Sequence, residues 1–408
     1  MTAVLDKIVN EGYTVLKKTV FILLYPIIFF LYIFKIKFCE IDHKFGQTLR
    51  FTEGFMVARK YYDFKELKNC RIIFLLELNK CNSQMTTMIK RNLKIFNFNF
   101  LFKLIVRMLY YWDKKDFILE MNNYAIKILL LRSDKNPYNF HKENFLKLSN
   151  DEIKKGYKIL EQFNLKPNDK WICIANRDEN YKNIRFPDWN WKYHNYRNFS
   201  VESLKESAEY FASKGYYVFR MGYLMKEKLN TENEKIIDYA NSEIRNDFLD
   251  VFLLAKCAFY FGGDTGISDV AFHFRRPTYG INFSSTAIDN GRSHTPFLFT
   301  FKRIKNIATG KLLSLNDILN SKFAFTARYE DFVKNNVAPI ENSSDELRSF
   351  AIEAEKDNKG VNYESSLDLE NQQKFWDIYF KKVPKERMGQ IMPKVSPIFL
   401  RKNMDLLN

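Results

Sequence analysis

A short glycine-rich turn carries the clearest chemical signal in the sequence. Residues 257–261 form an apolar, strand-like run, and residues 262–266 follow it with the sequence Gly-Gly-Asp-Thr-Gly. The next segment, residues 267–274, has the apolar spacing of a helix. The first turn of a helix offers unpaired N–H groups and a positive dipole, so a turn in this position can hold a phosphate or a diphosphate. The candidate ligand-binding residues here are Asp264, Thr265 and Gly266.

Polar residues also lie at the ends of two other strand-like segments, residues 171–175 and 216–221. These residues are Asn176, Arg177, Asp178, Arg220 and Gly222. Because the carboxyl ends of parallel strands meet at one edge of a sheet, we expect them to line one crevice with the glycine turn. An arginine in that crevice suits two oxygens of a phosphate. Taken singly, Arg177 with Asp178 can be explained as a local ion pair and the glycine turn as an ordinary turn; together they favour a nucleotide site.

An aromatic and polar segment, residues 188–197, is too irregular in sequence for a core strand. Segments of this kind often line binding sites as loops. Its tryptophans and tyrosines suit stacking on a base or a sugar ring, and packing of the loop onto its own domain is the alternative. We identify His194 and Arg197 as further candidates for ligand binding.

The elements that position these groups are those of a parallel α/β domain. Residues 171–284 alternate strand and helix patterns, with Ser200 placed to cap one helix and Gly215 to end it. Right-handed crossovers between such strands produce a parallel, Rossmann-like sheet. Upstream, residues 71–77 are predicted to form a buried strand and residues 83–93 a helix, which indicates a first α/β region.

Composition limits the class of protein. With 408 residues and 46% hydrophobic side chains, the chain has room for two folded domains. The net charge of +16 suits anionic partners, but lysine is spread along the whole chain, so nucleic acid is not an expected partner. The five cysteines are widely spaced, without a Cys-x-x-Cys pair or a nearby histidine. This pattern predicts no disulfide framework, no metal site and a reducing compartment.

The amino-terminal region contains an uncharged apolar stretch. Residues 19–34 carry no charged side chain, are bracketed by two lysines on each side and contain Pro26. About 20 apolar residues are needed to cross a bilayer, and flanking lysines can extend a shorter segment. We therefore predict membrane contact over residues 14–38, as a tilted span or as a re-entrant anchor. A buried core helix is the alternative, and the lack of a small-residue cleavage site argues against a signal peptide.

Six segments together carry a family pattern: residues 171–178, 193–198, 215–222, 238–242, 274–277 and 396–403. They resemble a bacterial family of glycosyltransferases encoded with surface-polysaccharide genes, and the resemblance covers most of residues 165–300. In the first region, Ile41-Asp42-His43 is similar to an Ile-Gly-His pattern with Asp in place of Gly. The Asp-Thr-Gly turn is more distantly similar to the donor-diphosphate turn of heptosyltransferases. The resemblance implies a GT-B fold, in which two Rossmann-like domains face a cleft, and a nucleotide-sugar donor.

In such an enzyme the candidate residues have definite roles. The sequence has no Asp-x-Asp pair, the motif with which metal-dependent glycosyltransferases hold the donor, so we predict a reaction without metal or cofactor. A GT-B enzyme neutralises the leaving diphosphate with a helix dipole, N–H groups and basic side chains. Arg177, Arg197, Thr265 and Gly266 are the candidates for this role. In an inverting reaction His43 is the candidate base, with Asp42 behind it; a histidine at the membrane interface is the alternative.

The sequence thus predicts four regions and a leading function. Residues 1–40 are the membrane anchor, 41–165 the acceptor-side domain, 166–330 the nucleotide-sugar domain, and 331–408 a helical tail that packs back on the first domain. The leading function is sugar transfer from a nucleotide-sugar to a lipid-linked or cell-surface glycan, at the cytoplasmic face of a bacterial inner membrane. The alternatives are another nucleotide-dependent transferase, of phosphate or pyruvate, and a non-catalytic basic membrane adaptor.

Overall fold

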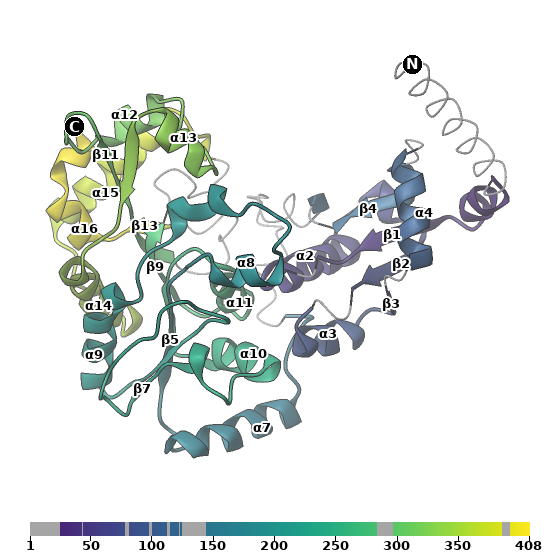
Figure 1. The fold of residues 1–408 in the computed structure, drawn as a ribbon, viewed down its shortest axis with the longest axis horizontal. Helices are drawn as coiled ribbons and strands as arrows, with labels where there is room; N and C mark the ends of the chain where they lie inside the picture. The colour runs from purple at the N-terminus through teal and green to yellow at the C-terminus, as the bar shows by residue number, and fades with distance from the viewer. Residues whose placement is uncertain are drawn as a thin grey trace, which may run out of the picture.

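The computed structural model describes residues 25–42, 44–77, 81–97, 100–111, 115–121, 123–124, 144–283, 297–385 and 392–408. These residues form two α/β domains that lie next to each other along the long axis of the molecule (Figure 1). Each domain has a sheet of parallel strands with helices packed on it. The predicted α/β class with parallel sheets is therefore confirmed.

The first domain is built on a four-stranded sheet with the order β3-β2-β1-β4. The residues of β1, which we expected in the anchor, pair in parallel with β2 on one side and β4 on the other. They belong to the sheet because Phe38 and Cys39 are both buried, in different hydrophobic clusters of the domain. The elements are β1 (Ile36–Glu40), α2 (Gln47–Tyr61), β2 (Arg71–Leu76), α3 (Ser83–Lys90), β3 (Ile95–Asn97), α4 (Phe100–Tyr111) and β4 (Ile118–Glu120).

The second domain has a seven-stranded sheet with the order β13-β10-β9-β8-β5-β6-β7, in which neighbouring strands run parallel. The strands predicted from residues 171–175 and 216–221 are confirmed as β5 and β6. The strands are β5 (Trp171–Ala175), β6 (Tyr217–Arg220), β7 (Ile236–Ile237), β8 (Tyr260–Gly262), β9 (Thr278–Phe283), β10 (Phe297–Phe301) and β13 (Lys394–Val395). The helices before the tail are α7 (Asn150–Leu160), α8 (Asn180–Arg185), α9 (Lys205–Ser213), α10 (Asp247–Lys256), α11 (Gly266–His273) and α12 (Leu315–Asn320).

The carboxyl-terminal tail completes the second domain. Phe375 and Tyr379 of α15 share a buried hydrophobic cluster with Phe299 and Phe301 of β10. The prediction that the tail packs back on the first domain is therefore wrong for these elements, because their aromatic side chains cover the end of the second sheet. The tail contains α13 (Tyr329–Lys334), α14 (Ser344–Asn358), α15 (Ser366–Tyr379) and α16 (Pro397–Lys402), and β12 (Val337–Ile340) pairs with β11 (Arg303–Asn306).

The predicted membrane segment is described in part. Residues 25–33 are helical and lead through a turn into β1, whereas residues 14–24 lie outside the described residues. Among the helices that the structure describes, none has the length and apolar character needed to cross a membrane.

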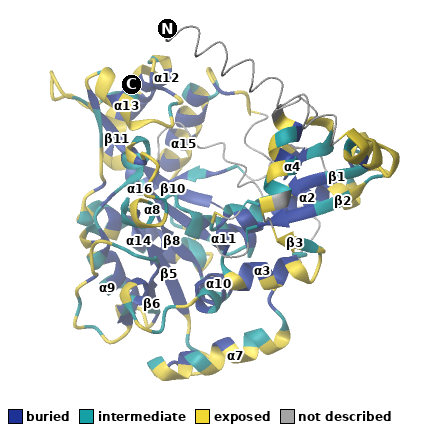
Figure 2. Ribbon diagram, turned by 45° about the vertical axis from the view of Figure 1, so that its right-hand side comes forward, coloured by how far each residue is buried: buried dark blue, intermediate teal, exposed yellow. Residues whose placement is uncertain are grey.

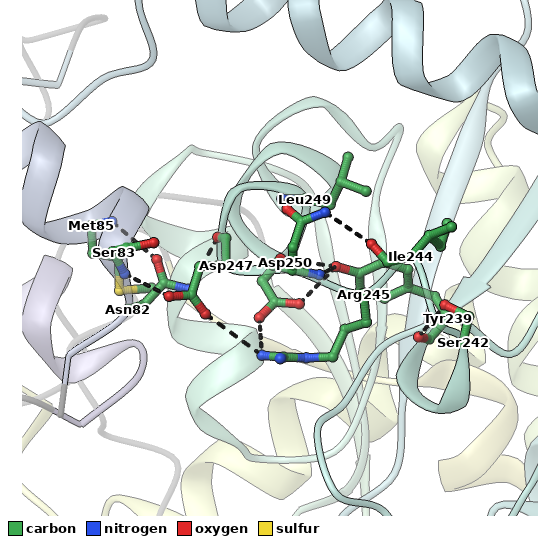
Figure 3. Close-up of polar contacts among 11 residues, drawn as sticks. Asn82, Ser83, Met85, Tyr239, Ser242, Ile244, Arg245, Asp247, Leu249 and Asp250 are labelled. Atoms are coloured by element: carbon green, nitrogen blue, oxygen red, sulfur yellow. Dashed lines mark hydrogen bonds and ion pairs between the residues drawn. The ribbon is translucent and has the colours of Figure 1, made fainter. Parts of the chain in front are cut away.

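The two domains meet through two pairs of helices, α2 with α11 and α3 with α10. At the second joint, the Asp247 carboxylate at the start of α10 accepts a hydrogen bond from the Ser83 N–H at the start of α3 (2.8 Å). The Asn82 side-chain amide donates to the Asp247 carbonyl (3.0 Å). Arg245 lies beside Asp247 and also pairs with Asp250 (Figure 3). One carboxylate thus caps a helix of the opposite domain.

We expect Asp247→Ala to lower the free energy of unfolding by roughly 1–2 kcal/mol, because the hydrogen bond from the Ser83 N–H, which joins the two domains at the start of α3, is lost. Urea unfolding followed by circular dichroism measures the change. Asp63→Ala is the matched control, since it removes a carboxylate that pairs with Lys68 at the surface, where an ion pair contributes little. Equal effects of the two substitutions would contradict a special role for Asp247.

Candidate functional site at the domain junction

The glycine turn between β8 and α11 is the centre of the site. A Cβ at Gly262 would overlap the Ala175 carbonyl oxygen, and one at Gly263 would overlap the Phe199 ring, so this turn requires glycine. Thr265 is the N-cap of α11, and its hydroxyl accepts a hydrogen bond from the Ile267 N–H (3.1 Å). Because the hydroxyl hydrogen is not used in that bond, Thr265 can donate it to an anion at the helix start. The predicted strand, turn and helix are confirmed in their order.

The first domain reaches the same turn. Gly46 precedes α2 with φ at 84°, and a Cβ there would overlap the Gly266 carbonyl oxygen. Conversely, a Cβ at Gly266 would overlap the Phe45 carbonyl oxygen. The Arg50 guanidinium of α2 lies 3.5 Å from the Asp269 carboxylate of α11. The loop after β1 and the amino end of α11 are thus in backbone contact.

Two arginines lie beside the turn, as the sequence predicted. Arg197 places its guanidinium 3.4 Å from the Asp264 carboxylate. Arg177 is buried and donates to the His194 carbonyl (3.2 Å) and to the Asn198 side chain. Among the described residues, Arg177 Nη2 and Arg197 Nε are buried without a hydrogen-bond partner. Burial, followed by the charge of Arg197, lowers the pKa of Arg177 to about 10. These guanidiniums therefore have donor capacity for an anion.

Lys182 of α8 is a central cation that the sequence analysis missed. Its ammonium lies 4.2 Å from the centre of the Trp191 ring. Burial is the main cause that lowers the pKa of Lys182 to about 7, and the charges of Arg177, Arg197 and Lys44 act in the same direction. Lys44 belongs to the loop after β1, so both domains contribute positive charge. Only its place shortly after the β5 end could have indicated Lys182 in the sequence, because lysine is common throughout the chain.

Lys302 adds a further buried cation from the segment after β10. Its ammonium donates to the Asn198 carbonyl and lies 3.9 Å from the Glu341 carboxylate. Burial lowers the pKa of Lys302 to about 8, although Glu341 opposes the shift and Arg177 adds to it. Cations from α8, the aromatic segment and the end of the sheet thus gather around the Asn198 region.

The aromatic segment packs against this group of cations. The Trp189 and Trp191 rings are stacked with centroids 5.7 Å apart, and Trp191 is parallel to the His194 ring. His194 Nδ1 lies 2.9 Å from Arg197 Nη2. Burial and the neighbouring cations lower the pKa of His194 to about 2, so the imidazole is neutral at pH 7. Because the imidazole is neutral, it does not attract an anion by charge. Its contact with Arg197 positions that side chain. Trp189 is 69% exposed and offers a free ring face.

Other predicted residues lie beneath the site. The Arg220 guanidinium is completely buried and donates to Asp238 (3.0 Å) and to Asn176 (3.1 Å). Asp178 accepts hydrogen bonds from the N–H groups of Asn180 (3.0 Å) and Lys226 (2.9 Å), which joins two loops. The loop after β6 turns at Gly222, where a Cβ would come within 2.6 Å of Met225. Asn176, Asp178, Arg220 and Gly222 thus shape the loops around the cations, and burial of Arg220 and Asn176 explains why they face each other.

The two predicted catalytic residues belong to the loop after β1. His43 lies outside the described residues. The Asp42 carboxylate accepts a hydrogen bond from the Lys44 N–H (2.7 Å), and the Lys44 ammonium lies 3.8 Å from it. Asp42 is half-buried, and its carbonyl accepts from the Thr48 hydroxyl (2.7 Å). Asp42 is therefore held against the amino end of α2, in the loop that also contains Lys44.

In the part of the chain that the structure describes, no group of three or more His, Cys, Asp or Glu side chains is arranged to hold a metal ion. All five cysteines are free thiols.

A cavity of about 590 Å³ lies elsewhere, before β9, near the end of α10. Basic side chains line part of it, but they are engaged by the backbone: Arg276 donates to the Cys257 carbonyl (3.3 Å) and Arg275 to the His273 carbonyl (2.7 Å). It opens at the amino ends of β8 and β9, whereas the glycine turn lies at the carboxyl end of β8. The volume of this cavity therefore does not identify the candidate site. We place the site at the junction on the basis of its charges.

The class of protein defined by this architecture is a two-domain α/β protein with a cationic, helix-capped turn at the domain junction. No protein-family model matches the chain, and no curated protein matches it in sequence. Among solved structures it is similar to an Escherichia coli ADP-heptose lipopolysaccharide heptosyltransferase II, with 13% identity over 60% of this chain and 84% of that one and a TM-score of 0.38. It is also similar to a glycosyl transferase of family 9 from Veillonella parvula, with 10% identity over 78% and 98% of the two chains and a TM-score of 0.45. A third similar structure is the E. coli heptosyltransferase WaaC with ADP, at 9% identity over 60% and 87% and a TM-score of 0.31.

We expect Gly266→Ala to destabilise the protein by roughly 1–3 kcal/mol, because the added methyl group forces the two backbones apart. At a helix position with free space the same substitution stabilises by about 0.4–1 kcal/mol. The sign of the change in a thermal or urea unfolding curve therefore tests the contact between the domains. A stabilising effect would show that Gly266 and Phe45 are not in contact in solution.

Proposed function

We propose that the protein is a glycosyltransferase that binds the diphosphate of a nucleotide-sugar donor at the domain junction. The observation that carries this proposal is the group of crowded cations around the capped amino end of α11, with buried guanidinium nitrogens that have no partner among the described residues. Burying unpaired charge is unfavourable, so the site is suited to an anionic ligand that restores the balance.

The proposed chemistry follows from these charges. When the bond between sugar and diphosphate breaks, negative charge develops on the leaving oxygen. Lys182, Arg177 and Arg197 would stabilise that charge, together with the Thr265 hydroxyl and the N–H groups at the start of α11. They do so without a metal ion, in the manner of a GT-B enzyme. The exposed Trp189 ring is available to stack on a base or a sugar.

The acceptor side of the reaction is assigned to the loop after β1. In an inverting reaction a base removes the proton from the acceptor hydroxyl as that oxygen attacks the anomeric carbon. Asp42 and His43 are the candidate bases, because the loop that holds them contacts the amino end of α11 through Phe45 and Gly46. The acceptor is proposed to be a lipid-linked or cell-surface glycan at the cytoplasmic face of a bacterial inner membrane. The exposed aromatic side chains of residues 25–34 support membrane association.

The donor site can be tested by ligand-induced thermal shifts with ADP, GDP, UDP and CMP. A nucleotide at 100-fold over its dissociation constant adds roughly 2.7 kcal/mol of stability. We expect at least one diphosphate to raise the melting temperature, and Arg177→Ala and Thr265→Ala to remove that rise. The ligand-induced shift is compared between the variants and the wild type. The melting temperatures themselves are not compared, since Arg177 also donates a hydrogen bond to Asn198 and its loss can change the stability of the free protein. Arg348→Ala, which removes an exposed guanidinium on α14, is the control and should keep the full response.

A folded protein that responds to no nucleotide would contradict the donor site and favour the basic membrane adaptor. A response to nucleoside triphosphates or phosphoenolpyruvate, with none to diphosphates, would favour the phosphate or pyruvate transferase.

The shifted pKa of Lys182 predicts that a nucleoside diphosphate binds together with a proton. At pH 8 an amine with a pKa of about 7 is mostly neutral. A bound diphosphate raises that pKa, so about 0.5–1 proton is taken up per ligand and affinity falls as the pH rises from 7 to 9. Calorimetry at pH 8 in buffers of different ionisation enthalpy measures the uptake.

Lys182→Gln should remove most of the proton uptake and weaken binding, whereas the control Lys205→Gln, at a lysine of α9 that pairs with Glu202, should change neither. Equal uptake in the wild type and Lys182→Gln would assign the proton to another group.

A further inference from the structure

The amino-terminal helix exposes large apolar side chains around most of its circumference. Seven side chains between residues 25 and 34 are each at least 40% exposed: Tyr25, Ile27, Phe29, Phe30, Tyr32, Ile33 and Phe34. Leu31 is buried in the hydrophobic cluster of the first domain, and Ile28 is half-buried. A helix that is apolar all round is stable when an apolar medium surrounds it, whereas a helix that packs on one protein surface needs a single apolar stripe.

A second element, α4, continues this surface. Its inner face contributes Val106 and Leu109 to the same cluster as Leu31. Its outer face carries Phe100 (80% exposed), Leu104 (43%) and Tyr110 (44%). With the exposed Arg107 between them, these positions follow one another at spacings of four, three and three residues, which places all four on one side of the helix. The helix is therefore apolar on both sides, although only one side is covered by the protein.

The two helices lie at the same end of the molecule. Figure 1 places α4 and the helix of residues 25–33 at the end of the first domain that is remote from the second domain, and Figure 2 shows exposed residues on both. Their shared contact through Leu31 agrees with this placement. The exposed side chains thus belong to one face of the molecule and not to scattered positions, and such apolar patches mark interaction surfaces.

Basic side chains surround this face. Lys35 and Arg71 are exposed at the start of β1 and β2, and the Arg71 guanidinium lies 6.0 Å from the Phe34 ring centre. Lys94 lies 5.7 Å from the ring centre of Phe96. Lys103 is paired with Glu77. Burial and then the negative charges of Glu120 and Glu40 raise the pKa of Tyr110, so the positive charge of this face is concentrated away from Tyr110. Apolar side chains surrounded by exposed cations fit the headgroup region of an anionic bilayer.

We propose that the outer face of α4, together with residues 25–34, forms one surface that lies on an anionic lipid bilayer. Phe100 and Leu104 insert between the lipids, while Arg107, Lys35 and Arg71 contact lipid phosphates. The proposal rests on the membrane association proposed above and is independent of the transfer reaction. A surface formed by two helices gives the first domain a fixed orientation on the membrane. A single helix would only tether the domain.

Sedimentation of the full chain with vesicles tests this surface. Vesicles of phosphatidylcholine with 30% phosphatidylglycerol are compared with vesicles of phosphatidylcholine alone. We expect Phe100→Ser with Leu104→Ser to weaken binding to the anionic vesicles by about tenfold or more, because two apolar side chains no longer leave water. The matched control is Leu367→Ser with Leu369→Ser, which changes two exposed leucines of α15 in the second domain and should bind as the wild type does.

Arg107→Gln provides a second test that does not disturb packing, because this side chain is exposed. We expect weaker binding to the anionic vesicles and no change with the neutral ones. If both α4 variants bind the anionic vesicles as strongly as the wild type does, the proposed surface is overturned while membrane association stands. A wild type that binds neither vesicle would overturn both. A nucleotide-induced thermal shift shows that a variant is folded. If a variant lacks this shift but binds vesicles normally, the result bears on the donor site alone. If the double variant is unfolded, Phe100→Ser alone decides.

Discussion

The contact between the backbones at Gly46 and Gly266 sets how closely the two domains approach. Each glycine faces a carbonyl oxygen of the opposite domain at a distance that leaves no room for a Cβ atom. The contact lies at the start of both α2 and α11, so the helices that join the domains begin where their backbones touch. The second joint, where Asp247 caps α3, fixes the same pair of domains at another point. With two contacts, the position of the loop after β1 relative to the glycine turn is determined before any ligand binds.

The cations beside the turn come from the second domain, and the first domain adds the charge of Lys44. Arg177, Lys182 and Lys302 all have pKa values below their usual range because they are buried next to other positive charges. The surrounding hydrogen bonds to backbone carbonyls and the aromatic rings of the 188–197 segment hold them in place. Burial next to like charge reduces local stability, and in the proposed donor site a bound anion would offset this cost, a common arrangement in binding sites.

The first domain connects two different surfaces through β1. This strand begins at Ile36, next to the exposed apolar helix, and ends at Glu40, two residues before Asp42 at the domain junction. Five strand residues span about 17 Å. The exposed apolar helix and the loop with Asp42 therefore lie at opposite ends of one short strand. The second domain carries the larger sheet and the carboxyl-terminal helices, and it provides most of the cations.

Local patterns in the sequence determined most of the second domain. Strands β5, β6 and β8, the capped start of α11 and the turn at Gly215 follow from apolar runs and from residues with strong conformational preferences, which act over a few neighbours. Arg177 and Thr265 could be predicted because they lie next to such elements, and Arg197 because it belongs to an aromatic and polar segment too irregular for a core strand. Tertiary structure alone decided three other features. Residues 36–40 form a strand because β2 and β4 pair with them on the two sides. The tail belongs to the second domain because the aromatic side chains of α15 pack on the phenylalanines of β10. Lys182 became a central cation because burial and the charges of Arg177, Arg197 and Lys44 act on one ammonium, and the contribution of Lys44, from the other domain, leaves no mark in the residues around Lys182.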